Sequence, residues 1–309
     1  MLVKDFIQII YDGVGTQQDY QNKSVNPIYT DERICRQLNL ALNKYASFTK
    51  ALEAYHSLPV AGNIASIMLP DYMLRSEGIR FLVWFINGYA YPLSDRNLNN
   101  TYGNFPVAMQ GLPRWFNIWE DRINFFPQNS NGYNKTTITS NVSAVGTTVP
   151  VVSTNGFTIK NGRFTIGNEI IQYNYKDATN FYECRRGMED TTAVNYVSGT
   201  DLNENNVWVY YYRLHFPITV NSSGSIPVEI LNKEMLICDE HLEIIADYTI
   251  YKLLSKIDAG RATPYKINFD DWLKEAKYAI NKGRAIVSKG SSVRNPFIFE
   301  TAEPLWSNF

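Results

Sequence analysis

Residues 113–127 read PRWFNIWEDRINFFP, and this stretch sets the pattern for the whole chain. Two short runs rich in aromatic and β-branched residues flank Glu120 and Asp121, and a proline closes each end. Such a pattern is typical of a β-hairpin. The predicted hairpin ends at Pro127, where the composition of the chain changes.

Residues 128–206 differ from the sequence on both sides. They are rich in Asn, Thr, Gly and Val and show no helical period, and Asn-Gly pairs at 155–156 and 161–162 separate short alternating runs. Beyond them, VWVYYYRLHFP at 207–217 resumes the strand character of the hairpin. The pattern predicts a small β domain inserted into a host domain.

Helical spacing of apolar residues marks the N-terminal part of the host domain. A first helix is expected to end near Gly13 or Gly15. Thr30 is a predicted N-cap, because Asp31 and Glu32 follow it and place negative charge at the positive end of a helix. The apolar stripe of the second helix extends over residues 34–55.

Two helices are also predicted in the last third of the chain. Residues 236–254 keep helical spacing until Gly260 and Pro264. Asn268 can cap the next helix, whose pattern dissolves beyond Gly283.

A further hairpin is expected at residues 80–91, where Asn87-Gly88 suits a type I′ turn. Together the elements predict an α+β fold, a helical bundle with β-hairpins that carries an inserted small all-β domain and an extended C-terminal tail. The predicted parts are the body at residues 1–127 and 207–290, the insert at 128–206 and the tail at 291–309.

The composition narrows the function classes. The 309 residues carry 29 Lys and Arg against 30 Asp and Glu, so affinity for nucleic acid or anionic membranes is not the expected main activity. Aromatic residues make up 14%, which suits broad contacts with other proteins as well as a core. Three distant cysteines indicate a reducing compartment without a disulfide framework. We find no secretory signal and no apolar run of membrane-spanning length.

Catalytic and cofactor motifs are absent from the sequence, so no enzyme activity, cofactor or metal is predicted. Cys238 and His241 are three residues apart, but no second pair accompanies them as in a metal site. A lowered thiol pKa at Cys184, beside Arg185 and Arg186, is a remote alternative.

Acidic neighbours offer the other candidate chemistry. Pairs occur at 120–121, 239–240 and 270–271, but adjacency in sequence does not place two carboxylates across a glycosidase cleft. The pair at 270–271 is interpreted as negative charge at a helix N-terminus.

The order of elements resembles the head-to-tail adaptor, or connector-ring, proteins of tailed phages. The resemblance rests on GLPRWF at 111–116, INFFP at 123–127, WVYYYRLHFP at 208–217 and IPVE at 226–229. It implies a structural virion protein that forms a ring of about twelve copies, joins the portal to the tail and lines the DNA channel. Its partners would be itself, the portal protein, the next tail or neck ring protein and, transiently and non-specifically, the passing DNA, but no membrane.

The same resemblance implies a place in the virion neck, after assembly in the host cytoplasm. The abundance of Asn, Ile and Tyr suggests an AT-rich genome and a crAss-like phage.

The insert is itself similar to a small β module of phage virion proteins. It carries Ile-Gly-x-Glu at 166–169 and Arg-Gly-x-x-x-Thr at 186–191. Gly167 and Gly187 are expected at turns with positive φ, and Glu169 is expected to pair with Arg186 inside the module.

The predicted tail is the candidate for docking on the portal. Prolines hold it extended, and its anchors would be Phe297, Phe299, Trp306 and Phe309, with Arg294 before them. Lys282, Arg284, Lys289 and Arg294 form a basic cluster that could face an acidic partner, the DNA or solvent. The alternative for the tail is a disordered end.

Two other function classes stay open. A receptor- or carbohydrate-binding virion protein would use the insert for recognition, with exposed aromatic rings stacked on sugars. A cell-wall hydrolase is the third alternative, and it lacks a visible nucleophile or metal constellation.

Overall fold

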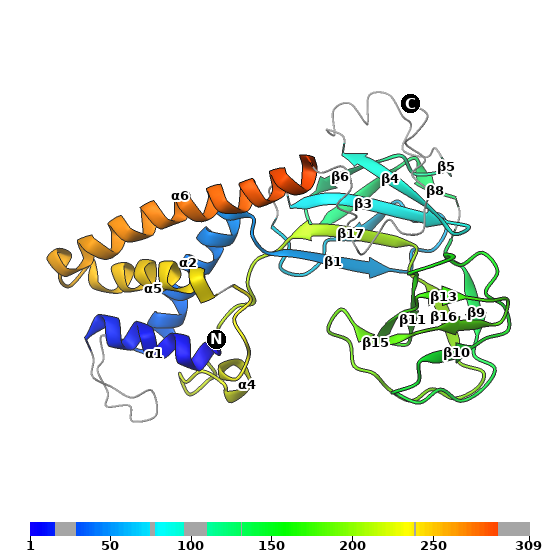
Figure 1. The fold of residues 1–309 in the computed structure, drawn as a ribbon, viewed down its shortest axis with the longest axis horizontal. Coiled ribbons are helices and arrows are strands. Elements are labelled where there is room, and N and C mark those ends of the chain that lie inside the picture. The colour runs from blue at the N-terminus through cyan, green and yellow to red at the C-terminus, as the bar shows by residue number, and fades with distance from the viewer. Residues whose placement is uncertain (16–28, 75–77, 96–109, 131, 238, 290–309) are drawn as a thin grey trace. The chain divides into compact units, whose positions relative to one another are not determined.

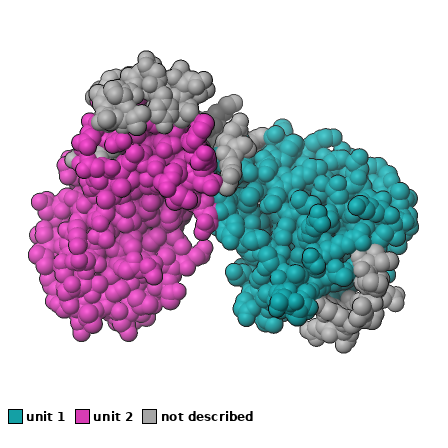
Figure 2. Space-filling view, turned by 180° about the vertical axis from the view of Figure 1, so that it is seen from behind, with its two compact units in different colours: residues 1–53, 72–78, 212–291 teal, residues 54–71, 79–211, 292–309 magenta. Residues whose placement is uncertain are grey.

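The computed structural model describes residues 1–15, 29–74, 78–95, 110–130, 132–237 and 239–289. The chain forms two compact units, coloured teal and magenta in Figure 2. The first, the helical unit, comprises the described residues within 1–53, 72–78 and 212–289. The second, the β unit, comprises those within 54–71 and 79–211.

The helical unit packs its helices around one apolar core (Figure 1). Phe6, Leu38, Ile245 and Phe269 are fully buried in it, each from a different helix. The described helices are α1 (Val3–Val14), α2 (Asp31–Thr49), α4 (Val228–Leu231), α5 (Asp239–Leu254) and α6 (Ala259–Lys289). No described helix is both long enough and apolar enough to cross a membrane.

The predicted start of α2 is confirmed, but its predicted end is wrong. The Thr30 side chain accepts a hydrogen bond from the backbone N–H of Arg33 at 3.3 Å. The helix stops at Thr49, because Lys50 adopts a left-handed conformation with φ of 54°. The following residues enter strand β1 (Glu53–Leu58), whose apolar positions had extended the helical stripe in the sequence.

The predicted break before α6 is displaced. Asp258 accepts a hydrogen bond from the backbone N–H of Arg261 at 3.0 Å and so caps the helix, which continues through Gly260, Pro264 and Asn268. Asn268 is therefore not a cap. Helix α6 also continues beyond Gly283 to Lys289.

A seven-stranded sheet forms one part of the β unit. Its order is β1-β17-β3-β4-β6-β7-β2. Strands β4 and β6 pair in parallel, whereas the pairs β17–β3, β3–β4, β6–β7 and β7–β2 are antiparallel. Its remaining strands are β2 (Ser66–Met68), β3 (Ile79–Ile86), β4 (Tyr89–Asp95), β6 (Trp115–Trp119), β7 (Arg122–Phe126) and β17 (Val207–Tyr212).

Both predicted hairpins are confirmed within this sheet. Strands β3 and β4 meet at Asn87 and Gly88, whose φ values of 50° and 85° are those of a type I′ turn. In the other hairpin, β6 pairs with β7 from Trp119 opposite Arg122.

The other part of the β unit, here called the β-module, contains strands β9 to β16. Phe164, Tyr173 and Phe181 are fully buried in its core, where Phe164 stacks on Tyr173 and the ring of Phe181 contacts both at a tilt. Its strands are β9 (Lys135–Thr137), β10 (Thr148–Pro150), β11 (Arg163–Ile166), β12 (Glu169–Gln172), β13 (Tyr175–Lys176), β14 (Asn180–Tyr182), β15 (Arg185–Met188) and β16 (Asp201–Glu204). The short strands β5 (Gln110–Gly111) and β8 (Gln128–Asn129) pair with each other.

The predicted fold class is wrong. The described chain is mostly β-sheet, with a seven-stranded curled sheet and further sheets beside five helices, rather than a helical bundle with hairpins. The physical reason is pairing between distant segments, since β17 pairs with β3 and joins β1 to the hairpins. The predicted boundaries at residues 128, 207 and 291 stay predictions.

Candidate functional site

Several residues that the sequence singled out cannot be placed. Five of them belong to the predicted docking tail and lie outside the described residues: Arg294, Phe297, Phe299, Trp306 and Phe309. Cys238 also lies outside them. His241, its proposed partner, forms a hydrogen bond through Nδ1 with the hydroxyl of Tyr45 in the helical unit. Among the described residues, no group of three His, Cys, Asp or Glu side chains could hold a metal ion.

The predicted ion pair between Glu169 and Arg186 is confirmed in the β-module. Arg186 Nε and Nη2 each lie 2.8 Å from a carboxylate oxygen of Glu169. The backbone N–H groups of Gly187 and Val194 donate to the same carboxylate. Burial alone raises the pKa of Glu169, but these hydrogen bonds hold it below its ordinary value. Gly167 and Gly187 have the predicted positive φ, 56° and 62°.

A second buried carboxylate, Glu189, connects the β-module to strand β1. It accepts hydrogen bonds from the backbone N–H of Ser57 at 2.9 Å and from the Ser57 hydroxyl at 2.5 Å. His56 Nδ1 lies 3.0 Å away and Arg163 Nη1 lies 2.9 Å away. The Glu189 side chain is only 6% exposed, and its hydrogen bonds supply the polar partners that a buried carboxylate needs.

Arg163 completes this cluster. Its guanidinium carbon lies 4.1 Å from the ring centroid of Tyr55 and 4.6 Å from that of Trp208. Its Nη2 is 3.4 Å from Gln172 Oε1. An arginine enclosed between two aromatic rings and a carboxylate fixes the register of the strands that carry them.

The cluster contains the residue types of a serine hydrolase triad, but its arrangement differs from one. In a triad the histidine lies between the carboxylate and the serine and takes the hydroxyl proton. Here the Ser57 hydroxyl donates to Glu189 directly and accepts a hydrogen bond from Asn205 Nδ2 at 3.0 Å. Ser57 is also 1% exposed, which leaves no approach for a substrate carbonyl. We assign these residues a structural role.

The two remaining chemical candidates are also corrected. Burial raises the pKa of the Cys184 thiol to about 12, and Arg186 only partly opposes this, so the expected lowering of the thiol pKa is wrong. Asp270 and Asp271 lie in the middle of α6 and not at a helix N-terminus. Asp271 forms a surface ion pair with Lys274 at 3.3 Å.

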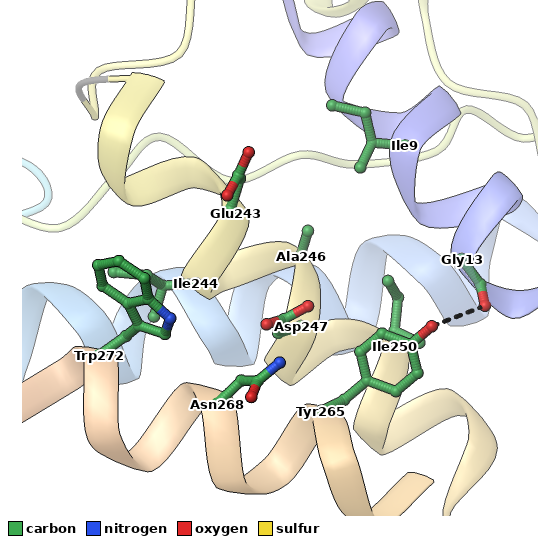
Figure 3. A pocket seen from close by; sticks show the side chains of 10 residues that line it. All are labelled: Ile9, Gly13, Glu243, Ile244, Ala246, Asp247, Ile250, Tyr265, Asn268 and Trp272. Carbon is green, nitrogen blue, oxygen red and sulfur yellow. Dashed lines mark hydrogen bonds between the residues drawn. The ribbon is translucent and has the colours of Figure 1, made fainter. Parts of the chain in front are cut away.

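The helical unit contains a groove of about 440 Å³ between three helices (Figure 3). This volume is large enough for one or two long side chains of a partner. The lining residues come from α1 (Ile9, Gly13), from α5 (Glu243, Ile244, Ala246, Asp247, Ile250) and from α6 (Tyr265, Asn268, Trp272).

The shape of the groove depends on close helix packing. A Cβ at Gly13 would lie 2.3 Å from Cδ1 of Ile250, so glycine at this position lets α1 approach α5. The Tyr265 hydroxyl lies 3.5 Å from the Gly13 carbonyl oxygen and ties α6 to α1 weakly. Figure 3 shows Asp247 and Asn268 between Trp272 and Tyr265, which lie toward opposite ends of the groove.

Negative charge without a matching cation distinguishes the groove. Glu243 and Asp247 lie four residues apart on one face of α5, and none of the described residues that line the groove is basic. Burial raises the pKa of Asp247, the Glu243 charge raises it further, and the Asn268 side chain partly offsets both. Such a site favours a cationic group from outside the unit.

The rim of the groove is apolar. Trp272 is 50% exposed and Ile9 is 38% exposed, although both could have been buried in a closed helix interface. A half-exposed tryptophan beside carboxylates is suited to bind a basic or aromatic side chain.

The sequence analysis did not identify Glu243 and Asp247. The spacing of Glu243 and Asp247 was one available signal, because like charges four residues apart on a helix repel each other and lower its stability. The place of Trp272 in the groove could not be predicted from the sequence, since it depends on how α6 packs against α5.

The sequence matches no protein-family model and no curated protein.

Proposed function

We propose that the chain is a structural virion protein that forms a ring in the neck of a tailed phage. In this role it joins the portal to the tail and lines the channel through which DNA passes. The ring would consist of identical copies, with the portal protein and the next tail or neck ring protein as its neighbours. No catalysis, cofactor or membrane is part of the proposal.

The observation that carries the proposal is the exposure of large apolar side chains on α6. Ile267, Trp272 and Tyr278 are 57%, 50% and 69% exposed on this helix. Large apolar side chains on an exposed helix favour binding to another protein, and tryptophan and tyrosine are the side chains most enriched at such sites. A ring needs this kind of surface on every copy.

The charge balance supports the DNA-channel part of the proposal. A protein with a net charge of −1 has little tendency to hold DNA, since non-specific affinity comes from neutralised phosphates. DNA could therefore pass such a ring with only transient contact.

Electron microscopy of the purified chain with the portal protein of the same phage tests the proposal. We expect closed rings stacked coaxially on the portal. Chains that remain single and leave the portal bare at micromolar concentration would contradict it. The variant Ile267→Ser with Tyr278→Ser should bind the portal less while unfolding at the same temperature, because both side chains are exposed.

A second candidate function, carbohydrate binding by the β-module, is favoured by one observation. Tyr175 is 45% exposed, and its ring stacks on that of Tyr182 with centroids 5.0 Å apart. Asp177, which could accept a sugar hydroxyl, already accepts hydrogen bonds from the Tyr182 hydroxyl and from the Thr179 and Asn180 backbone. The carboxylate is thus committed to the turn, which makes this candidate the weaker one.

A glycan array with the full chain separates the two candidates. Specific binding that Tyr175→Ala abolishes would favour carbohydrate recognition, whereas the ring proposal predicts no selective glycan.

A further inference from the structure

We infer that the groove between α1, α5 and α6 binds the basic C-terminal segment, residues 289–299, of a second copy of this chain. The inference rests on the proposed ring and names the contact that joins its neighbours. Arg294 would pair with Glu243 and Asp247, and the aromatic residues that follow it would pack against Trp272.

Charge complementarity is the first argument. Residues 239–247 contain four acidic residues and no Lys or Arg, whereas the proposed segment, residues 289–299, contains two basic residues, Lys289 and Arg294, and no acidic one. These two stretches carry opposite charge within a chain whose net charge is only −1. Attraction between copies is therefore concentrated on these two stretches.

The state of the groove is the second argument. Asp247 is half-buried, and burial together with the Glu243 charge raises its pKa. Its ionised form is therefore disfavoured as long as no cation is bound beside it. A guanidinium bound here would relieve both effects, because it binds carboxylates with two parallel hydrogen bonds.

The apolar rim is the third argument, and it selects a segment with aromatic residues. Trp272 is 50% exposed at the groove. Phe297 and Phe299 follow Arg294 by three and five residues, which matches a cation next to an apolar anchor.

Helix α6 explains why the segment comes from another copy. The helix continues from Trp272 to Lys289, and these 17 residues extend it by about 25 Å. Five further residues span at most about 18 Å even when fully extended, so Arg294 cannot reach back to the groove of its own chain. A contact between one surface and a different surface of the next copy is the kind that closes into a ring.

Disulfide trapping in the full-length chain tests the inference. One preparation carries Asn268→Cys in the groove, and a second, with an additional affinity tag, carries Phe297→Cys. After mixing and mild oxidation we expect a cross-linked species that contains one chain of each kind. Cys35 and Cys184 are buried. The third cysteine is removed from both preparations by Cys238→Ser, and this variant alone under the same oxidant gives the background.

A charge exchange tests the same contact without cysteines. Arg294→Glu or Glu243→Arg alone should weaken self-association about 10-fold, and the two together should restore it to within about 3-fold. Glu275→Arg, an exposed site on α6 outside the groove, is the matched control and should change association little. Glu243 is exposed, so the substitution leaves the core of the unit unchanged.

Each outcome decides the matter. Absence of a cross-link between the two preparations above the background, or a charge exchange without rescue, would overturn the inference. If rings still form in either case, the proposed function stands and only the contact is wrong. If no self-association is detected at all, the proposed ring itself fails.

Discussion

Glu169 in the β-module and Asp247 in the helical unit are two carboxylates with opposite surroundings. In the β-module, Glu169 is 1% exposed and receives hydrogen bonds from Arg186, Gly187 and Val194, which keep its pKa low. In the helical unit, Asp247 lies in a groove whose described lining has no basic side chain, and its pKa is raised.

This difference shows which of the two carboxylates is neutralised within its own unit and which lies without a basic side chain in its described surroundings. A carboxylate with all its partners in the same unit contributes to a fixed scaffold. Asp247 lies near Glu243 and the exposed Trp272, and its charge lowers the stability of the free helical unit. We therefore propose that the helical unit provides the contacts between copies, while Glu169 contributes to the fixed scaffold of the β-module.

Glu169→Gln should have the largest effect on stability. The substitution removes a charge from a buried bidentate pair and leaves the Arg186 guanidinium without its counter-ion, which costs about 3–5 kcal/mol in the free energy of unfolding of the β unit. Urea denaturation monitored for this unit measures it. The exposed pair of Lys135 and Asp201 gives the control, since Asp201→Asn should change stability far less.

Acidification should distinguish the two units next. His215 in the helical unit is 3% exposed and neutral, since Nδ1 bonds to the Phe216 carbonyl and Nε2 accepts from the Leu236 N–H. Burial lowers its pKa from 6.5 to about 4. The unfolded chain therefore binds the proton first, and stability present above pH 6.5 is lost as the pH falls toward 4, by at most about 3 kcal/mol.

Hydrogen exchange measured peptide by peptide between pH 7 and 5 checks this. The helical unit should lose protection, after correction for intrinsic rates, while the peptides around Glu169 keep theirs, because a carboxylate whose pKa is lowered loses its contribution only below the ordinary value of 4.5. In His215→Gln the pH dependence of the helical unit should flatten. Equal loss in both units would contradict the assignment.

Asp247→Asn should have the smallest effect, and its sign is the informative part. Removal of the disfavoured charge should raise the free energy of unfolding of the helical unit by at most about 1 kcal/mol while self-association weakens. Asp239→Asn should act oppositely on stability, because Asp239 lies at the start of α5 and pairs with the N-terminal ammonium group at 3.1 Å. A loss of stability in Asp247→Asn would mean that the groove is already complete.

Local patterns predicted local structure well. The Thr30 cap, the turn at Asn87 and Gly88 and the pair of Glu169 with Arg186 each involve groups close in sequence or a recognisable motif. The helix after Thr30 was predicted too long because its end is at Lys50, a residue with no sequence signal for positive φ.

Long-range pairing could not be predicted in the same way. The parallel pairing of β4 with β6 joins the two hairpins, and β17 pairs with β3, Val207 opposite Trp84, so that one sheet forms and the fold class changes. The groove could not be predicted either, because Gly13, Asp247 and Trp272 come from three different helices.

The continuity of α6 through Pro264 also depends on the tertiary fold. Its apolar side chains Phe269 and Leu273 are buried in the core, and this burial outweighs the helix-breaking tendency of Pro264.

Native mass spectrometry of the purified chain over a range of concentrations tests the central claim most directly. The account predicts monomers in equilibrium with one closed oligomer of fixed copy number, because contacts between different surfaces close when their rotation allows. A chain that stays monomeric at every concentration, or one that grows into open polymers without a preferred size, would contradict it.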